Sequence, residues 1–249
     1  MGSLIKSWFE AFLNLVYPRN LKCMICDETL LDTETNCLCE TCDARLIWLT
    51  ENSCVKCGRH IGLVSTVNTC YECKNEQRAY SKNCSMVLYN DDVKKLIYKL
   101  KYGDQRYIAY HMGNIMVEGL AEMGYGNENI DLIIPVPLHT TRLGERGFNQ
   151  SEWIGKQIAK RMQIPMSPLA VKRIRYTEPQ TLLNRAARLQ NLKGAFQVND
   201  EVQIVNKRIL VVDDVFTTGS TLNEVSYELV RMGAAHVITS TFAAANVRD

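Results

Sequence analysis

The residues best suited to chemistry are two adjacent carboxylates, Asp213 and Asp214, which follow four apolar residues at 209–212. That run is short and mostly β-branched, which predicts a buried strand. Small hydroxyl residues then surround Gly219, and an apolar pattern with helical spacing starts at Leu222. A buried strand, a small-residue loop and a helix start predict an anion site, because the loop amides and the positive helix end point at one ligand.

The two carboxylates set this loop apart from other phosphate-binding sequences. A Walker loop needs Gly-Lys-Ser/Thr, which the chain lacks here, and the paired acids of response regulators are not followed by a hydroxyl-rich loop. Two acids beside a phosphate-binding loop are consistent with a sugar phosphate as the ligand, because carboxylates accept hydrogen bonds from sugar hydroxyls and help to hold Mg²⁺. The alternative is a strand end whose acids cap the next helix. At a strand end, ionised side chains are expected to reach solvent at little cost.

Residues 211–222 resemble the phosphoribosyl-pyrophosphate (PRPP) signature of type I phosphoribosyltransferases, which is an apolar strand, two acids and a Thr/Gly/Ser loop. The resemblance implies that the two acids hold the ribose 2′- and 3′-hydroxyls and that the loop wraps the 5′-phosphate. The implied PRPP-binding residues of this stretch are Val212, Asp213, Asp214, Thr217, Thr218, Gly219, Ser220 and Thr221.

Cysteines form a second candidate centre, because nine of the ten fall between Cys23 and Cys73. Eight of them make four Cys-x-x-Cys pairs, and a shift of 31 residues places the first two pairs on the last two. This offset indicates an internal repeat of two Cys₄ units, each able to offer four thiolates to one Zn²⁺. The predicted metal ligands are Cys23, Cys26, Cys39, Cys42, Cys54, Cys57, Cys70 and Cys73.

A structural metal site is favoured over the other chemistry open to these cysteines. Disulfides fit poorly with a sequence that shows no secretory signal, and four redox pairs in so short a segment exceed any redox need. An iron–sulfur cluster is the alternative to zinc. Metal binding, of order 10 kcal/mol per structural zinc, supplies the folding energy of such a segment. We expect sequential pairing within each repeat, with His60 as a less favoured ligand and with Cys37 and Cys84 inert.

The composition allows one large domain or two small ones in 249 residues, with 46% hydrophobic residues and a net charge of +2. No run of 18 apolar residues is present, so no membrane span is expected, and a cytoplasmic protein is predicted. We predict three parts: an amphipathic helix within residues 1–20, a double zinc ribbon at 21–77 and an α/β domain at 78–249. The helix is expected to pack on protein, because its polar face is not rich in Lys and Arg.

In the third part, strands alternate with helices, which predicts a parallel sheet flanked by helices. Ligands of such sheets bind at the carboxyl ends of the strands. The predicted strands are 83–89, 131–136, 169–174, 196–198, 209–212 and 236–242. The predicted helices are 91–102, 107–123, 151–162 and 221–232, with residues 138–149 as a loop.

Charge is uneven along the chain, because residues 142–193 carry a net +8 and the remainder carries −6. A basic stretch is either a solvated face or a set of donors for a polyanion such as pyrophosphate or nucleic acid. The basic residues singled out here are Lys172, Arg173, Arg175, Arg185 and Arg188.

Further blocks resemble the ComF (competence protein F) family of phosphoribosyltransferase-like proteins: residues 134–137 with 145–150, and residues 180–196. The cysteine repeat resembles the double zinc ribbon at that family's amino end. The resemblance implies a type I phosphoribosyltransferase fold, a pyrophosphate loop at 135–142 and a flexible loop at 176–188. It also implies a bacterial protein tied to DNA uptake in natural transformation, with single-stranded DNA and competence proteins as partners. The residues implied beyond the acidic loop are Pro137, Leu138, Arg142 and Arg146.

Two functions are consistent with this resemblance. In the first, a nitrogen nucleophile attacks C1 of PRPP and displaces pyrophosphate, with Asp213, Asp214 and Arg146 as the catalytic residues. Mg²⁺ would bridge the pyrophosphate and the ribose hydroxyls, and Arg146 or the flexible loop would hold the pyrophosphate. In the second, the same scaffold senses PRPP or carries single-stranded DNA without turnover. The fold alone does not separate the two functions.

Overall fold

The computed structural model describes residues 22–30, 37–49, 53–62, 68–103, 105–175 and 192–247. By its contacts the chain divides into two compact units, Met1–Leu46 and Ile47–Asp249. The helix predicted within residues 1–20 lies outside the described residues. The predicted boundary between residues 77 and 78 stays a prediction: it follows composition, whereas the compact units follow contacts and place the second Cys₄ unit with the sheet.

The smaller unit holds the first Cys₄ unit and the short helix α2 (Glu40–Asp43), whose N-cap is Cys39. Lys22 and Thr29 form an antiparallel bridge across its first cysteine turn. Within that turn, Asp27 has φ +63° and its N–H donates to the Cys23 carbonyl at 2.9 Å. The tight turn brings the two cysteines of one Cys-x-x-Cys pair to the same side of the chain.

A four-stranded parallel sheet forms the centre of the larger unit, in the order β1-β6-β5-β2. Its strands are β1 (Asn83–Leu88), β2 (Leu132–Pro135), β5 (Arg208–Phe216) and β6 (His236–Ala244). The two central strands are buried almost throughout, as expected for a parallel sheet covered on both faces. The predicted parallel α/β fold is confirmed, and all four carboxyl ends meet at one edge.

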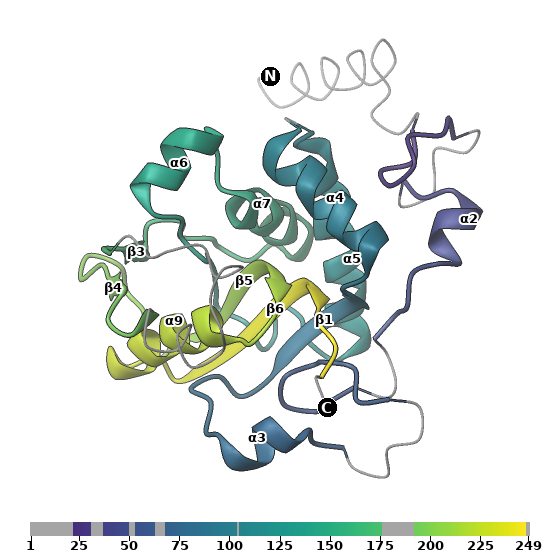
Figure 1. Ribbon diagram of the computed structural model, residues 1–249. Coiled ribbons are helices and arrows are strands. Elements are labelled where there is room, and N and C mark those ends of the chain that lie inside the picture. The colour runs from purple at the N-terminus through teal and green to yellow at the C-terminus, as the bar shows by residue number, and fades with distance from the viewer. Residues whose placement is uncertain are drawn as a thin grey trace. The chain divides into compact units, whose positions relative to one another are not determined.

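Helices cover both faces of this sheet (Figure 1). On one side lie α4 (Asp91–Tyr102), α5 (Tyr107–Glu122) and α7 (Gln150–Met162), and on the other lies α9 (Ser220–Arg231). Each predicted helix agrees with its observed counterpart to within one residue at each end. The apolar residues of α4 and α9 are buried, as their spacing predicts. Asn90 and Asn149 cap α4 and α7 by accepting from backbone N–H groups.

Three details differ from the sequence prediction. The strands β3 (Val171–Arg173) and β4 (Phe196–Val198) pair antiparallel with each other, apart from the main sheet. Residues 138–149 are not all loop, because α6 (Thr140–Arg146) forms there. This helix buries none of its residues, so it left no apolar periodicity to detect. Finally, β5 runs on through the two acids to Phe216, because they continue the parallel register with β6.

The second Cys₄ unit, with the short helix α3 (Tyr71–Asn75), is part of the core of the larger unit. It packs against the start of β1: the Asn83 N–H donates to the Lys56 carbonyl at 2.8 Å, and the Asn83 amide donates to the Cys57 carbonyl at 3.0 Å. Gly58 has φ +68°, and a Cβ there would lie 2.6 Å from the Asn83 carbonyl oxygen. Only glycine fits this position, since the turn meets the strand backbone directly.

Within the ranges described, every helix is too short or too polar to cross a bilayer.

Candidate functional site

A cavity of about 540 Å³ opens at the carboxyl edge of the sheet. Its wall is formed by the segment after β2, the ends of β3 and β5, the start of α9, the helices α4 and α6, and the first turn of α7. Most of the predicted ligand-binding residues line it, although they come from distant parts of the sequence. These are Pro137, Leu138, Arg142, Arg146, Arg173, Asp213, Asp214, Thr217, Gly219, Ser220 and Thr221.

Other predicted residues lie elsewhere. Val212 is fully buried in β5. Lys172 and Arg175 are exposed outside the cavity, and an Arg175 nitrogen donates to the Lys193 carbonyl at 2.8 Å. Arg185 and Arg188 fall outside the described residues, as does the whole predicted flexible loop at 176–188. Thr218 does not line the cavity either; its hydroxyl lies 2.7 Å from that of Ser220.

The acidic pair is more enclosed than its sequence position suggested. Asp214 is only 4% exposed and forms an ion pair with Lys101 of α4, with 2.5 Å between nitrogen and oxygen. Asp213 accepts a hydrogen bond from the Ser151 hydroxyl at 2.7 Å. The expectation that both carboxylates reach solvent freely is therefore wrong for Asp214. The physical reason is that β5 continues past the acids, so their side chains lie among α4 and α7.

This enclosure shifts the pKa values of the two carboxyl groups in opposite directions. Burial raises the pKa of Asp213 to about 7, and the adjacent charge of Asp214 acts in the same direction. For Asp214 burial also opposes ionisation, but the ammonium of Lys101 outweighs it and holds the pKa below its ordinary value. One carboxylate is thus fixed as an anion, while its neighbour titrates near neutrality.

Residues 217–221, called the phosphate loop here, join β5 to α9. Gly219 has φ +73° and is the N-cap of α9, so no N-cap side chain is present, and the Ser220 N–H donates to the Thr218 hydroxyl at 3.4 Å. A Cβ on Gly219 would lie 2.3 Å from the ring of Phe216, so the loop can close only over a glycine. Gly219, Ser220 and Thr221 at the start of α9 line the cavity, and the backbone N–H groups and hydroxyls of a helix start are the donors typical of an anion site.

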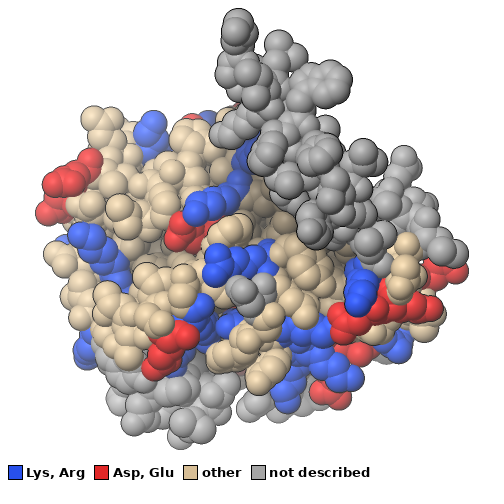
Figure 2. Space-filling model, turned by 90° about the horizontal axis from the view of Figure 1, so that it is seen from above, with Lys and Arg blue, Asp and Glu red and all other residues tan. Residues whose placement is uncertain are grey.

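Cationic and aromatic side chains form the opposite wall. The Arg146 guanidinium donates to Gln150 at 3.2 Å and to the Tyr102 hydroxyl at 3.1 Å, and it lies 5.1 Å from the centroid of the Tyr102 ring. Lys94 and Lys101 of α4 also line the cavity. Figure 2, seen from above, shows groups of Lys and Arg side chains across the middle of this face, with fewer acidic ones between them.

Several cavity residues had no predicted role. Lys101 is one of four lysines interspersed with the apolar residues of α4, and periodicity does not show which of them turns inward. Gln150 ends the ComF-like block at 145–150 and Ser151 follows it, but the resemblance gave neither residue a role at the site. Gln150 now lies 3.5 Å from Asp214. The tyrosines of the wall, Tyr89, Tyr98 and Tyr102, gave no sequence signal beyond their type.

The cysteines form two separate clusters, and in each the sulfurs lie within 4.8 Å of one another. One holds Cys23, Cys26, Cys39 and Cys42, and the other holds Cys54, Cys57, Cys70 and Cys73. Sulfurs around a tetrahedral zinc, at about 2.3 Å from the metal, are about 3.8 Å apart. The Cys26–Cys39 and Cys57–Cys70 distances are 3.7 and 3.8 Å. The donor sets therefore fit zinc, and pairing within each repeat is confirmed.

The remaining candidates lie outside these clusters. His60 is in neither group, and its Nδ1 accepts from the Gly62 N–H at 3.3 Å. Cys37 and Cys84 are buried, and burial raises the pKa of each thiol to about 11. All the cysteines within the ranges described are free of disulfides.

Known families match both parts of the chain. Residues 12–74 match the model of the double zinc ribbon domain, and residues 149–249 match that of the phosphoribosyl transferase domain. Competence protein F of Haemophilus influenzae is 29% identical over 221 residues, which cover 88% of this chain and 94% of that protein. DNA utilization protein YhgH of Salmonella typhi is 30% identical over 202 residues, covering 80% and 87%.

The chain belongs to the ComF family. Competence protein ComFC of Streptococcus pneumoniae is a more distant relative, 24% identical over 232 residues and covering 88% of this chain and 98% of its own. In this ComF protein the acidic pair and the phosphate loop lie within the match to the phosphoribosyl transferase domain, and the eight clustered cysteines lie within the match to the double zinc ribbon.

We predict two Zn²⁺ per ComF chain, one for each Cys₄ cluster. Cys39→Ser and Cys70→Ser remove equivalent ligands of the two repeats, so elemental analysis should show the loss of one ion in either variant. Cys70→Ser should also lower the thermal midpoint of the larger unit, because Cys70 is part of its buried core. Full metal content in both variants would contradict the assignment.

Asp213 predicts a pH dependence of stability. Its folded-state pKa of about 7 lies above the ordinary value of 3.8, so the folded protein binds this proton more tightly than the unfolded chain. The contribution is complete below pH 3.8 and is lost as the pH rises to 7. We expect the free energy of unfolding, measured with urea, to fall across this window relative to that of Asp213→Asn.

A matched control is Asp131→Asn. Hydrogen bonds from Arg208 lower the pKa of Asp131, so its contribution is lost only below the ordinary value. Between pH 4 and 7 this variant should parallel the unmodified protein. The cysteine clusters contribute the same pH dependence to every variant, so it cancels when the free energies of unfolding are compared between variants. If the free energy of unfolding of Asp213→Asn also follows that of the unmodified protein between pH 4 and 7, the raised pKa of Asp213 is wrong.

Proposed function

We propose that this ComF protein binds PRPP with Mg²⁺, transfers its phosphoribosyl group to a nitrogenous acceptor, and acts in the uptake or use of DNA. The observation that carries the proposal is the cavity, where a helix start with glycine as its N-cap, two acids and basic side chains line one space. The names of the relatives, competence protein F and DNA utilization protein, support the link to DNA.

The 5′-phosphate would bind at the phosphate loop. The N-cap of α9 is Gly219, which has no side chain to cap the helix, and a helix start favours a negative charge. Ser220 and Thr221 add hydroxyl donors at the cavity wall. Hydroxyl groups beside a helix start suit a phosphate monoester better than a neutral ligand.

The ribose hydroxyls would bind at the acidic pair. Asp213 is the more accessible of the two carboxylates and would accept hydrogen bonds from the 2′- and 3′-hydroxyls. Asp214 is held by Lys101 and would fix the position of its neighbour. The oxygen donors fit Mg²⁺, which usually keeps few protein ligands and is completed by substrate phosphates. When bound, Mg²⁺ would neutralise part of the pyrophosphate charge, with Asp213 as its nearest protein carboxylate.

Arg142 and Arg146 line the opposite wall and would bind the pyrophosphate. A nitrogen lone pair of the acceptor attacks C1, and the bond from C1 to the pyrophosphate oxygen breaks. The electron pair leaves with pyrophosphate, and the acceptor nitrogen loses its proton to solvent. The arginines stabilise charge that grows on the leaving group, while the loop and acids hold the sugar in position. The basic loop at 176–188 would complete this wall.

The cysteine clusters also suit a cytoplasmic protein, because reducing conditions keep thiols available for metal. Turnover separates an enzyme from a PRPP sensor on the same scaffold. Release of pyrophosphate from PRPP in the presence of a panel of nitrogenous acceptors decides between them.

Asp213→Asn should weaken binding of PRPP with Mg²⁺ by about tenfold or more, since hydrogen bonds to a charged group contribute about 1.5–3 kcal/mol. Ser220→Asp should weaken it further, because a carboxylate would stand where the phosphate binds. Ser220→Ala is the control for loss of the hydroxyl alone. Calorimetric titration measures each affinity. Equal affinities in all four proteins would overturn the proposed PRPP site.

A second candidate function, binding of single-stranded DNA, is favoured by the tyrosines of α4. Tyr98 and Tyr102 are 65% and 61% exposed, and their ring centroids lie 4.9 Å apart. Arg146 stacks on the second ring, and lysines flank both. Exposed aromatic rings beside cations are the typical platform for unstacked bases. The platform borders the cavity, because both tyrosines line its wall.

Binding of single-stranded DNA should weaken with salt, with a log–log slope of roughly 0.7 per neutralised phosphate. Tyr98→Ala should lower affinity about fivefold or more, since one stacked base contributes about 1–3 kcal/mol, and should leave the slope unchanged. Arg185→Glu with Arg188→Glu should lower affinity and slope together. Tyr227 is an exposed tyrosine of α9 away from the cavity, so Tyr227→Ala is the control. Salt-insensitive binding would count against this function.

A further inference from the structure

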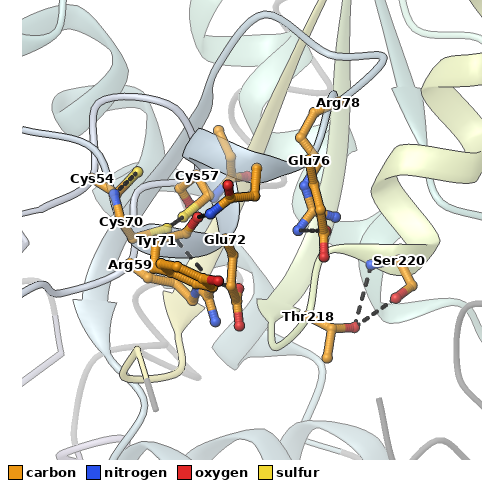
Figure 3. A network of polar contacts seen from close by, with 12 residues as sticks. Cys54, Cys57, Arg59, Cys70, Tyr71, Glu72, Glu76, Arg78, Thr218 and Ser220 are labelled. Carbon is orange, nitrogen blue, oxygen red and sulfur yellow. Dashed lines mark hydrogen bonds and ion pairs between the residues drawn. The ribbon is translucent and has the colours of Figure 1, made fainter. Parts of the chain in front are cut away.

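The second Cys₄ cluster contains a buried arginine. Arg59 is only 3% exposed. Its Nη2 forms an ion pair with Glu72 of α3 and lies 3.8 Å from the sulfur of Cys70. Figure 3 shows Arg59 beside Cys70 and Glu72, with Thr218 and Ser220 of the phosphate loop in the same view. A buried cation beside a thiolate offsets its charge, which accounts for one contact of the guanidinium.

The same guanidinium also contacts the ring of Phe216. The carbon centre of the guanidinium lies 6.0 Å from the ring centroid, within the range of a cation–π interaction. Tyr80 meets this ring edge-on, with 6.4 Å between centroids and 89° between planes. Phe216 is the last residue of β5 and is 1% exposed. Its ring is therefore held by the cysteine-rich segment on one side.

On its other side the ring supports the phosphate loop. A Cβ on Gly219 would lie 2.3 Å and 2.7 Å from two ring carbons, so the glycine backbone rests directly on Phe216. A second connection runs in parallel, because the Ala79 N–H donates to the Asn223 side chain in the first turn of α9 at 2.9 Å. The backbone that would bind the 5′-phosphate is thus in contact with groups anchored to the second cluster.

The first repeat carries other residues at the matching positions, and the 31-residue offset makes the comparison direct. The counterpart of Arg59 is Glu28, and the counterpart of Gly58 is Asp27, with a similar positive φ. The first cluster has its own arginine, Arg45, whose Nη2 lies 3.2 Å from the Cys42 sulfur. An arginine beside a thiolate is therefore common to both clusters. Contact with Phe216 is particular to Arg59.

We infer that Arg59 is a positioning residue that holds the phosphate loop in its binding conformation by fixing Phe216 beneath Gly219. The inference rests on the proposed PRPP site for its functional meaning, but the coupling itself is a property of the ligand-free protein. The second cluster then has a role besides the stability of its own segment.

Gly219 allows a direct measurement, because it is the only one of the 14 glycines that follows a threonine. Labelling with ¹³C′-threonine and ¹⁵N-glycine isolates its amide signal in the full-length, metal-loaded protein. Arg59→Lys keeps the charge but loses the planar group over the ring. We expect the Gly219 signal to shift or broaden, and PRPP affinity to fall about threefold to tenfold, the usual effect of one partly buried cation–π contact. Arg45→Lys is the matched control and should change neither.

Zinc content and thermal midpoint are measured on each variant. Unchanged Gly219 signal and PRPP affinity in Arg59→Lys, with both ions retained, would overturn the inference. If Arg59→Lys loses metal or fails to fold, Glu72→Gln releases the guanidinium from its ion pair without a change in size, and the same two outcomes apply. If the unmodified protein binds no PRPP, the proposed function fails, whereas the Gly219 signal still tests the coupling.

Discussion

Parallel pairing of β5 with neighbours on both sides is the constraint on which the rest of the site depends. Because β2, β5 and β6 run in one direction, their carboxyl ends meet at a single edge. The segments that follow β2 and β5 must therefore emerge side by side. One supplies α6 and the start of α7, and the other supplies the acids and the phosphate loop. Residues some 70 positions apart are brought together by backbone register before any side chain contributes.

The two Cys₄ units show how one sequence pattern acquires different roles from different surroundings. Both repeats share ligand spacing, a turn with positive φ and a short helix that begins after the third cysteine. The first keeps one cysteine exposed, whereas three ligands of the second are buried within the core of the larger unit. The turn of the second unit approaches the backbone of Asn83 so closely that only glycine, Gly58, fits there, whereas the matching position of the first unit is Asp27.

A feature could be predicted from the sequence where it leaves a periodic or local signal. Such signals exist for the sheet, the helices α4, α5, α7 and α9, the phosphate loop and both cysteine clusters. The helix α6 was missed because it buries nothing, and the β3–β4 pair was misassigned because a three-residue strand does not reveal its partner. Periodicity could not identify Lys101 as the lysine of α4 that contacts the acidic pair. The role of Arg59 follows only from its contact with Phe216, which is far away in the sequence.

The Lys101–Asp214 contact makes the ligand-free site carry its own counter-ion. Without it, two carboxylates and no bound cation would leave an uncompensated charge at the edge of the core. Because the same ammonium already neutralises Asp214, Asp213 is the carboxylate of the pair that would be open to a divalent cation. Arrival of a polyanion changes that balance, since the lysine gains a second acceptor. The last turn of α4 therefore joins the charge balance of the acidic pair to an exposed aromatic surface, because Lys101 is followed directly by Tyr102.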